Sequence, residues 1–148
     1  MKILGMLAAF IILFMFSANT LPAEREQEKN PPLSKQEIQK LRDIAMIIAG
    51  EITRRNVKSV TVINFKDIEG NPSKMGKTAS VEFRKQMEAL GKTNFTVVDS
   101  GGEAFVTGMF LPFKGGDKWR LDIKILSPDN RLITSYSGFF RKTKGVKK

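Results

Sequence analysis

Residues 118–126 read KWRLDIKIL, and apolar and polar side chains alternate along the whole segment. One side of an extended chain here would carry only apolar residues, namely Trp119, Leu121, Ile123 and Ile125. The other side would carry Arg120, Asp122 and Lys124. A period of two is typical of a β-strand whose one face is buried. We therefore expect a sheet with one face against helices and the other facing solvent or a partner.

The segments on either side of this strand also favour extended structure. Glu103–Phe113 and Arg131–Phe140 are rich in β-branched and aromatic residues. Gly115 and Gly116 separate the first run from the middle one, and Pro128, Asp129 and Asn130 separate the middle run from the last. These are turn residues, so the three runs predict an antiparallel meander.

A helix is expected farther upstream, from Ser34 to about Asn56. Ser34 and Glu37 have the spacing of a capping box, and Leu33 and Ile38 are placed to form a hydrophobic staple around it. The apolar residues that follow recur at helical spacing: Ile38, Leu41, Ile44, Ala45, Ile48 and Ile52. One side of this helix should therefore be buried.

A strand, helix, strand unit is expected between that helix and the meander. Val57–Phe65 and Asn94–Asp99 have strand composition and should pair in parallel. Between them a loop at residues 67–72 precedes a second helix that ends at Gly91. Its apolar side comprises Met75, Ala79, Phe83, Met87 and Leu90. The predicted fold is α/β (α+β), a two-layer sandwich in the order αβαβββ, with two helices on one face of a mixed sheet.

The N-terminal region has the features of a targeting segment. Lys2 is followed by an unbroken apolar run, Ile3–Phe16, as in a secretory signal peptide. Because Phe16 and Leu21 stand where cleavage favours small side chains, residues 1–23 are either a cleaved signal or a retained membrane anchor. Residues 24–33 are expected to form a flexible tether, residues 34–140 the folded domain and residues 141–148 a basic tail. This organisation predicts export to the periplasm or association with a membrane.

Composition limits the chemistry. The chain has no His and no Cys, so imidazole-based triads, thiolate chemistry and the usual zinc, copper and iron sites are excluded. The segment GNPSKMGKT (Gly70–Thr78) resembles a phosphate-binding P-loop, but it has five residues between its glycines where four are required. We therefore expect no catalytic, cofactor-binding or metal-binding residues, and no enzyme.

The charge balance instead favours anionic partners. Lys and Arg total 25 against 15 Asp and Glu, a formal net charge of +10. The candidate contact residues lie in the tail and on the polar side of residues 118–126: Arg141, Lys142, Lys144, Lys147, Lys148, Arg120 and Lys124. Four aromatic residues of the meander flank basic residues and are interpreted as core and strand-end residues: Phe110, Phe113, Phe139 and Phe140.

Residues 57–140 resemble the bacterial envelope family that includes FlgO, CsgG and the N-terminal domain of TolB. The resemblance lies in VTVINF, DIEGNPSKMGK, FTVVD, AFVTG and the final WRLDIKILSPDNRLITSYSG, in that order. It implies a non-enzymatic domain that binds or assembles cell-envelope components, with an envelope protein or an anionic envelope component as partner. The lipid-bearing Cys of many relatives is missing here, and Ser100 stands where they usually have Arg. The alternative function is a basic nucleic-acid-binding domain, which an export signal disfavours. The sequence leaves the oligomeric state open.

Overall fold

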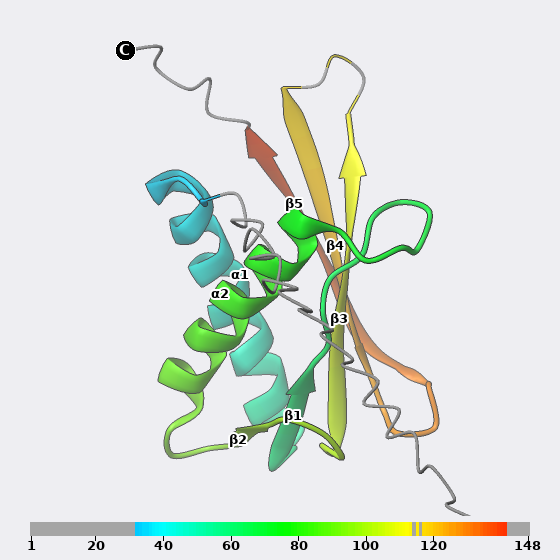
Figure 1. The fold of residues 1–148 in the computed structure, drawn as a ribbon. Helices are drawn as coiled ribbons and strands as arrows, with labels where there is room; N and C mark the ends of the chain where they lie inside the picture. Colours follow the sequence, from blue (N-terminus) through cyan, green and yellow to red (C-terminus); the bar gives the residue numbers. More distant parts are fainter. Residues whose placement is uncertain (1–31, 114, 116, 142–148) are drawn as a thin grey trace, which may run out of the picture.

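The computed structural model describes residues 32–113, 115 and 117–141, which form two layers (Figure 1). One layer holds the helices α1 (Lys35–Arg54) and α2 (Lys74–Gly91). The other is a five-stranded sheet of β1 (Ser59–Val62), β2 (Thr96–Val98), β3 (Ala104–Pro112), β4 (Lys118–Leu126) and β5 (Leu132–Arg141). Both helices cover the same face of the sheet, which confirms the predicted sandwich and its order.

The strands are arranged in the order β2-β1-β3-β4-β5. β1 pairs in parallel with β2, as expected, and also with β3, the first strand of the meander. β3, β4 and β5 are antiparallel neighbours, with Thr107 opposite Lys124 and Lys124 opposite Ser135. The sheet is therefore mixed, and its two edges differ: β2 has three residues and β5 has ten.

Side-chain caps fix where the two helices begin. Ser34 Oγ accepts a hydrogen bond from the Glu37 amide at 3.2 Å, and the Glu37 carboxylate accepts one from the Ser34 amide at 2.7 Å, so the predicted capping box is present. At α2, Ser73 Oγ accepts a hydrogen bond from the Gly76 amide at 2.9 Å. Each cap satisfies an amide that has no partner inside its helix, which stabilises the first turn.

The core lies between the layers. Leu41, Ile44, Ile48 and Ile52 of α1 are fully or almost fully buried, as their spacing predicted. Phe65 is central to the aromatic part of the core, with its ring centroid 5.7 Å from that of Phe83 and 6.4 Å from that of Phe110. Gly108 faces this ring, and a Cβ added there would lie 2.6 Å from Phe65 Cδ1.

Several details of the sequence interpretation were wrong. β1 ends at Val62, three residues before Phe65, because the chain leaves the ladder there and Lys66 bridges to β3 beside Met109. α2 does end at Gly91, as predicted, but Gly91 does not have a positive φ, and its small size leaves room for Phe95, whose ring would lie 2.6 Å from an added Cβ. The residue with positive φ near a helix end is Asn56, after α1, at 58°.

Candidate partner-binding surface

The sheet face opposite the helices is open to solvent. Leu121, Ile123 and Ile125 of β4 are fully buried under the helices, so the alternate residues Arg120, Asp122 and Lys124 lie on the other face. The register adds neighbours from both sides: Leu111, Met109 and Thr107 from β3, and Phe139, Ser137 and Ser135 from β5. We call these nine residues the open face.

A polar network lies at the centre of the open face. Arg120 Nη2 is 2.9 Å from Asp122 Oδ2, and Ser137 Oγ donates to Asp122 Oδ1 at 2.7 Å. Arg120 lies between Leu111 and Phe139 in the register, and its buried Nε has no hydrogen-bond partner among the described residues. The charge of Arg120 is thus partly neutralised by Asp122.

Lys124 is in a different situation, although it lies on the same strand and the same face. It is exposed, its strand neighbours are the uncharged Thr107 and Ser135, and it forms no ion pair with a described residue. Of the two basic residues predicted on this strand, Lys124 is therefore the one whose charge is free to meet an anionic group.

Exposed apolar side chains accompany these charges. Met109 is 37% exposed and Phe139 is 56% exposed, both on the open face. Phe113, 46% exposed and just beyond β3, packs edge-on against Phe139 with ring centroids 5.6 Å apart. Phe110 and Phe140 are core residues, as predicted, whereas Phe113 just beyond β3 and Phe139 near the end of β5 are exposed at strand ends. Exposed apolar residues gathered on one face are typical of a surface that binds a macromolecule.

The turn between β4 and β5 is held by its own side chains. Asp129 accepts hydrogen bonds from Ser127 Oγ and from the Arg131 guanidinium, and Asn130 adopts a positive φ of 60°. The hydrogen bond from Ser127, followed by that from Arg131, lowers the pKa of the Asp129 carboxyl. Arg131 is therefore engaged within the turn, which fixes the start of β5.

The predicted tail begins at Arg141, which is exposed but is still part of β5. In the register Arg141 lies opposite Lys118 of β4, so two cations are adjacent at this end of the sheet. Neither forms an ion pair with a described residue. Lys142, Lys144, Lys147 and Lys148 lie outside the described residues, and their role remains a prediction.

The loop from Asp67 to Ser73 uses its amides internally. Asp67 Oδ1 accepts hydrogen bonds from the amides of Glu69 and Asn71, and the Gly76 amide is bound by Ser73. Gly76 is small because the backbone of β1's extension passes it: an added Cβ would lie 2.1 Å from the Phe65 carbonyl oxygen. This geometry is an Asx turn followed by a helix cap, and not a phosphate cradle.

A groove of about 280 Å³ lies beside this loop. Its lining combines two carboxylates with apolar and aromatic side chains: Asp67, Glu69, Ile68, Ser73, Met75, Phe110, Pro112 and Trp119. Within the described ranges no three acidic residues gather as a metal site would need. The groove therefore combines apolar side chains with negative charge, whereas the open face combines apolar side chains with positive charge.

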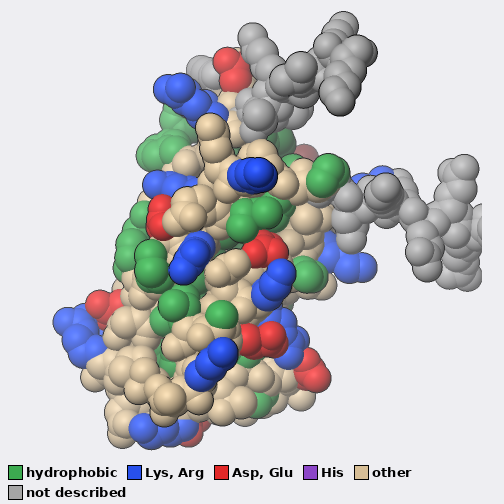
Figure 2. Space-filling model, turned by 90° about the vertical axis from the view of Figure 1, so that its left-hand side faces the viewer, with side chains coloured by type: hydrophobic (Ala, Val, Ile, Leu, Met, Phe, Trp, Pro, Cys, Tyr) green, Lys and Arg blue, Asp and Glu red, His purple; other side chains and the backbone are tan. Residues whose placement is uncertain are grey.

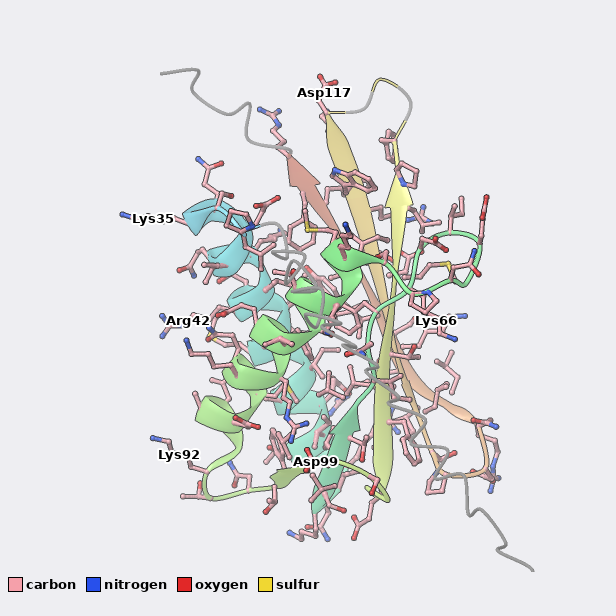
Figure 3. The ribbon with its side chains drawn as sticks, viewed as in Figure 1. Lys35, Arg42, Lys66, Lys92, Asp99 and Asp117 are labelled. Atoms are coloured by element: carbon pink, nitrogen blue, oxygen red, sulfur yellow. The ribbon has the colours of Figure 1, made fainter. Side chains whose placement is uncertain are left out.

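The helix layer carries charges of both signs. Figure 2 shows Lys and Arg side chains spread over this face, with Asp, Glu and apolar side chains among them. Lys35, Arg42 and Lys92 project away from the helices, and Lys66 projects from the loop after β1 (Figure 3). The helix layer has no single-sign patch in this view. None of the helices in the described part of the chain is long and apolar enough to cross a bilayer.

Known structures share this fold. The C-terminal domain of LpoB from Salmonella enterica matches with a TM-score of 0.54 and 12% identity, covering 71% of this chain and 98% of that domain. The Escherichia coli LpoB C-terminal domain matches with a TM-score of 0.53 and 11% identity, covering 70% and 97%. Lipoprotein GNA1162 from Neisseria meningitidis matches with a TM-score of 0.41 at 10% identity, covering 61% of this chain and 84% of that chain. No family model and no curated protein sequence matches the chain, so the resemblance to the FlgO, CsgG and TolB family remains a prediction.

Proposed function

We propose that this chain is an exported or membrane-tethered, non-enzymatic domain that binds cell-envelope components and helps to assemble them. The open face carries the proposal, because exposed Met109 and Phe139 lie on the same face of the sheet as the free cation Lys124. The apolar run Ile3–Phe16 supports export. The fold shared with the LpoB C-terminal domain supports a domain of this size and architecture.

Binding in this proposal combines two contributions. The cations of the open face and of residues 141–148 attract an anionic envelope component over a distance set by salt screening. The exposed apolar residues then contribute contact area that salt does not weaken. A partner that meets both requirements is an envelope protein with an acidic surface, or a protein held on an anionic membrane or wall polymer.

Export is tested with a fusion of residues 1–30 to a reporter that is active only outside the cytoplasm. We expect activity, because Lys2 and the following apolar run supply the basic and hydrophobic parts of a signal. The control replaces Leu13 with Arg, which interrupts the apolar run and should silence the reporter. An inactive wild-type fusion at normal expression would contradict export.

The charge contribution is tested by replacing Lys142, Lys144, Lys147 and Lys148 with Gln, which keeps the chain length. Arg141 is left unchanged because it completes β5. Each cation near an anionic membrane contributes about 1 kcal/mol, so co-sedimentation with anionic vesicles and with peptidoglycan should weaken strongly at low salt. Near 1 M salt, where the Debye length is about 3 Å, the difference should vanish. Equal sedimentation at every salt concentration would assign binding to the open face alone.

A further inference from the structure

β5 is a long strand at the edge of the described sheet. It spans Leu132–Arg141, and β4 is its one neighbour among the described residues, whereas the opposite edge, β2, has three residues. In an antiparallel pair about half of the backbone N–H and C=O groups point away from the partner strand. For β5 these outward groups form no hydrogen bond with any residue that the structure describes. An unpaired row of this kind is a template for another strand.

β5 also lacks the features that usually protect an edge. Proteins protect edge strands with proline, with central charged residues, or with bulges that disrupt the ladder. Between Leu132 and Phe140 there is neither a proline nor a charge. The only irregularity lies at the start, opposite Ile125 and Leu126, so the ladder is regular from Thr134 to Arg141. The usable edge is therefore eight residues long.

Apolar side chains lie on both sides of this edge. On the helix side, Ile44 of α1 packs over Gly138, where an added Cβ would be 3.0 Å from Ile44 Cδ1. Ile47, three residues later and thus on the same side of α1, is 48% exposed. On the open face, Phe139 is exposed on the edge strand itself. An added strand would therefore bury apolar surface on both faces of the sheet.

The charges near the edge indicate which residues an added strand should carry. Lys118 and Arg141 lie opposite each other at one end, and neither has a carboxylate partner among the described residues. A second copy of this chain fits poorly, because each chain has a formal charge of +10 and an antiparallel β5–β5 ladder would place Arg141 near the Arg131 end of the other copy. Acidic residues beside Lys118 and Arg141 would be favourable instead.

We propose that β5 accepts an extended segment of a partner protein as a sixth strand, and that this segment has β-branched residues at its centre and acidic residues beside Lys118 and Arg141. Backbone hydrogen bonds to β5 give most of the affinity, and the acidic end gives the selectivity, as in other cases of strand addition. This mode of binding depends on the edge strand, whose last residue is Arg141, and not on export or on residues 142–148, so it can fail while the proposed function stands.

The test uses the full chain in nonionic detergent and a synthetic peptide of alternating Thr and Val with two Glu at each end. Hydrogen exchange of the fragment that covers β5 should slow at least about tenfold on peptide binding, while exchange in β2 should not change. The double variant Lys118→Glu with Arg141→Glu should bind the peptide about tenfold more weakly at low salt and should prefer the same peptide ended by Lys. The matched control is Lys66→Glu with Lys92→Glu, which makes the same change in net charge at exposed positions away from β5 (Figure 3) and should bind as the parent does.

Four results would overturn the proposal. Protection confined to residues outside β5 would show that the peptide binds elsewhere, and equal weakening by both double variants would show that only net charge matters. Protection of β5 without peptide that grows with protein concentration would assign the edge to a second copy. Protection without peptide at every concentration would show that the chain's own residues already cover the edge.

Discussion

The two faces of β4 come from one short sequence and have opposite properties. Toward the helices, Leu121, Ile123 and Ile125 are fully buried and their contribution is to stability. Toward solvent, Arg120, Asp122 and Lys124 are partly or fully accessible. Each residue is assigned to its face by position alone, because successive side chains of a strand alternate. We therefore expect substitutions one residue apart on β4 to change either stability or binding.

The largest expected difference is between Ile123→Ala and Lys124→Ala. Ile123 is fully buried, so its truncation removes core contacts and leaves a cavity, at a cost of about 2 to 5 kcal/mol in the free energy of unfolding. Lys124 is exposed, and its truncation should change that free energy by less than about 0.5 kcal/mol. Urea unfolding of both variants measures the difference.

Lys124→Ala should also weaken binding to anionic vesicles, whereas folded Ile123→Ala should bind as the parent does. A stable Ile123→Ala variant, or a Lys124→Ala variant that unfolds as readily as Ile123→Ala, would contradict the assignment of the two faces.

Glycine-to-alanine substitutions at two positions should change the free energy of unfolding in opposite directions. Gly108 of β3 faces the core, and an added Cβ would lie 2.6 Å from Phe65 Cδ1, so Gly108→Ala should destabilise the fold by about 1 to 3 kcal/mol. Gly50 of α1 is exposed and has no atom within 4 Å of an added Cβ. Gly50→Ala should therefore stabilise the protein by about 0.5 to 1 kcal/mol through helix propensity. Thermal unfolding checks both signs, and destabilisation by both substitutions would contradict the prediction.

The sequence predicted the layers well because local patterns specify them. The alternation of residues 119–125, the helical spacing of Leu41, Ile44, Ile48 and Ile52, and the Ser34 cap each depend on neighbours within about one turn or one strand. The same alternation, applied to β3, could have placed Met109 on the open face. Asp122 could also have been paired with Arg120, since residues two apart share a strand face.

The features that the sequence did not predict depend on contacts between residues far apart in the chain. The position of β3 beside β1 follows from packing between segments more than 40 residues apart, as in the pairing of Val60 with Ala104. Gly91 ends α2 as predicted, but its close approach to the Phe95 ring does not follow from the local pattern. The free edge of β5 and its cations depend on the order of all five strands, so this part of the surface became visible only in the structure.

The capping box of α1 should stabilise the helix layer that covers one face of the sheet. Ser34→Ala removes the acceptor for the Glu37 amide and should cost about 0.5 to 2 kcal/mol. Ser73→Ala at α2 is a matched control for a cap of similar geometry, with one hydrogen bond to the Gly76 amide. Because the Ser34 cap is reciprocal and the Ser73 cap is not, Ser34→Ala should cost at least as much in the free energy of unfolding. Unchanged unfolding midpoints for both variants would show that these caps do not stabilise the protein.

The smallest effect on stability is expected from Asp122→Asn, which should change binding instead. Asn keeps the shape of the side chain and can still accept the hydrogen bond from Ser137, so the free energy of unfolding should fall by less than about 1 kcal/mol. The substitution removes the negative charge that neutralises Arg120. The open face then carries two free cations, Arg120 and Lys124, instead of one.

Binding of the Asp122→Asn variant to anionic vesicles should accordingly strengthen by about two- to fivefold at low salt and should match the parent near 1 M salt. Asp99→Asn is the control, because it makes the same change in net charge after β2, where Asp99 pairs with Arg84 at 2.6 Å (Figure 3). If the open face is the contact surface, only the Asp122 variant should gain affinity. If both variants gain equally, binding responds to the total charge of the chain, and the position of Arg120 and Lys124 on the sheet has no special role.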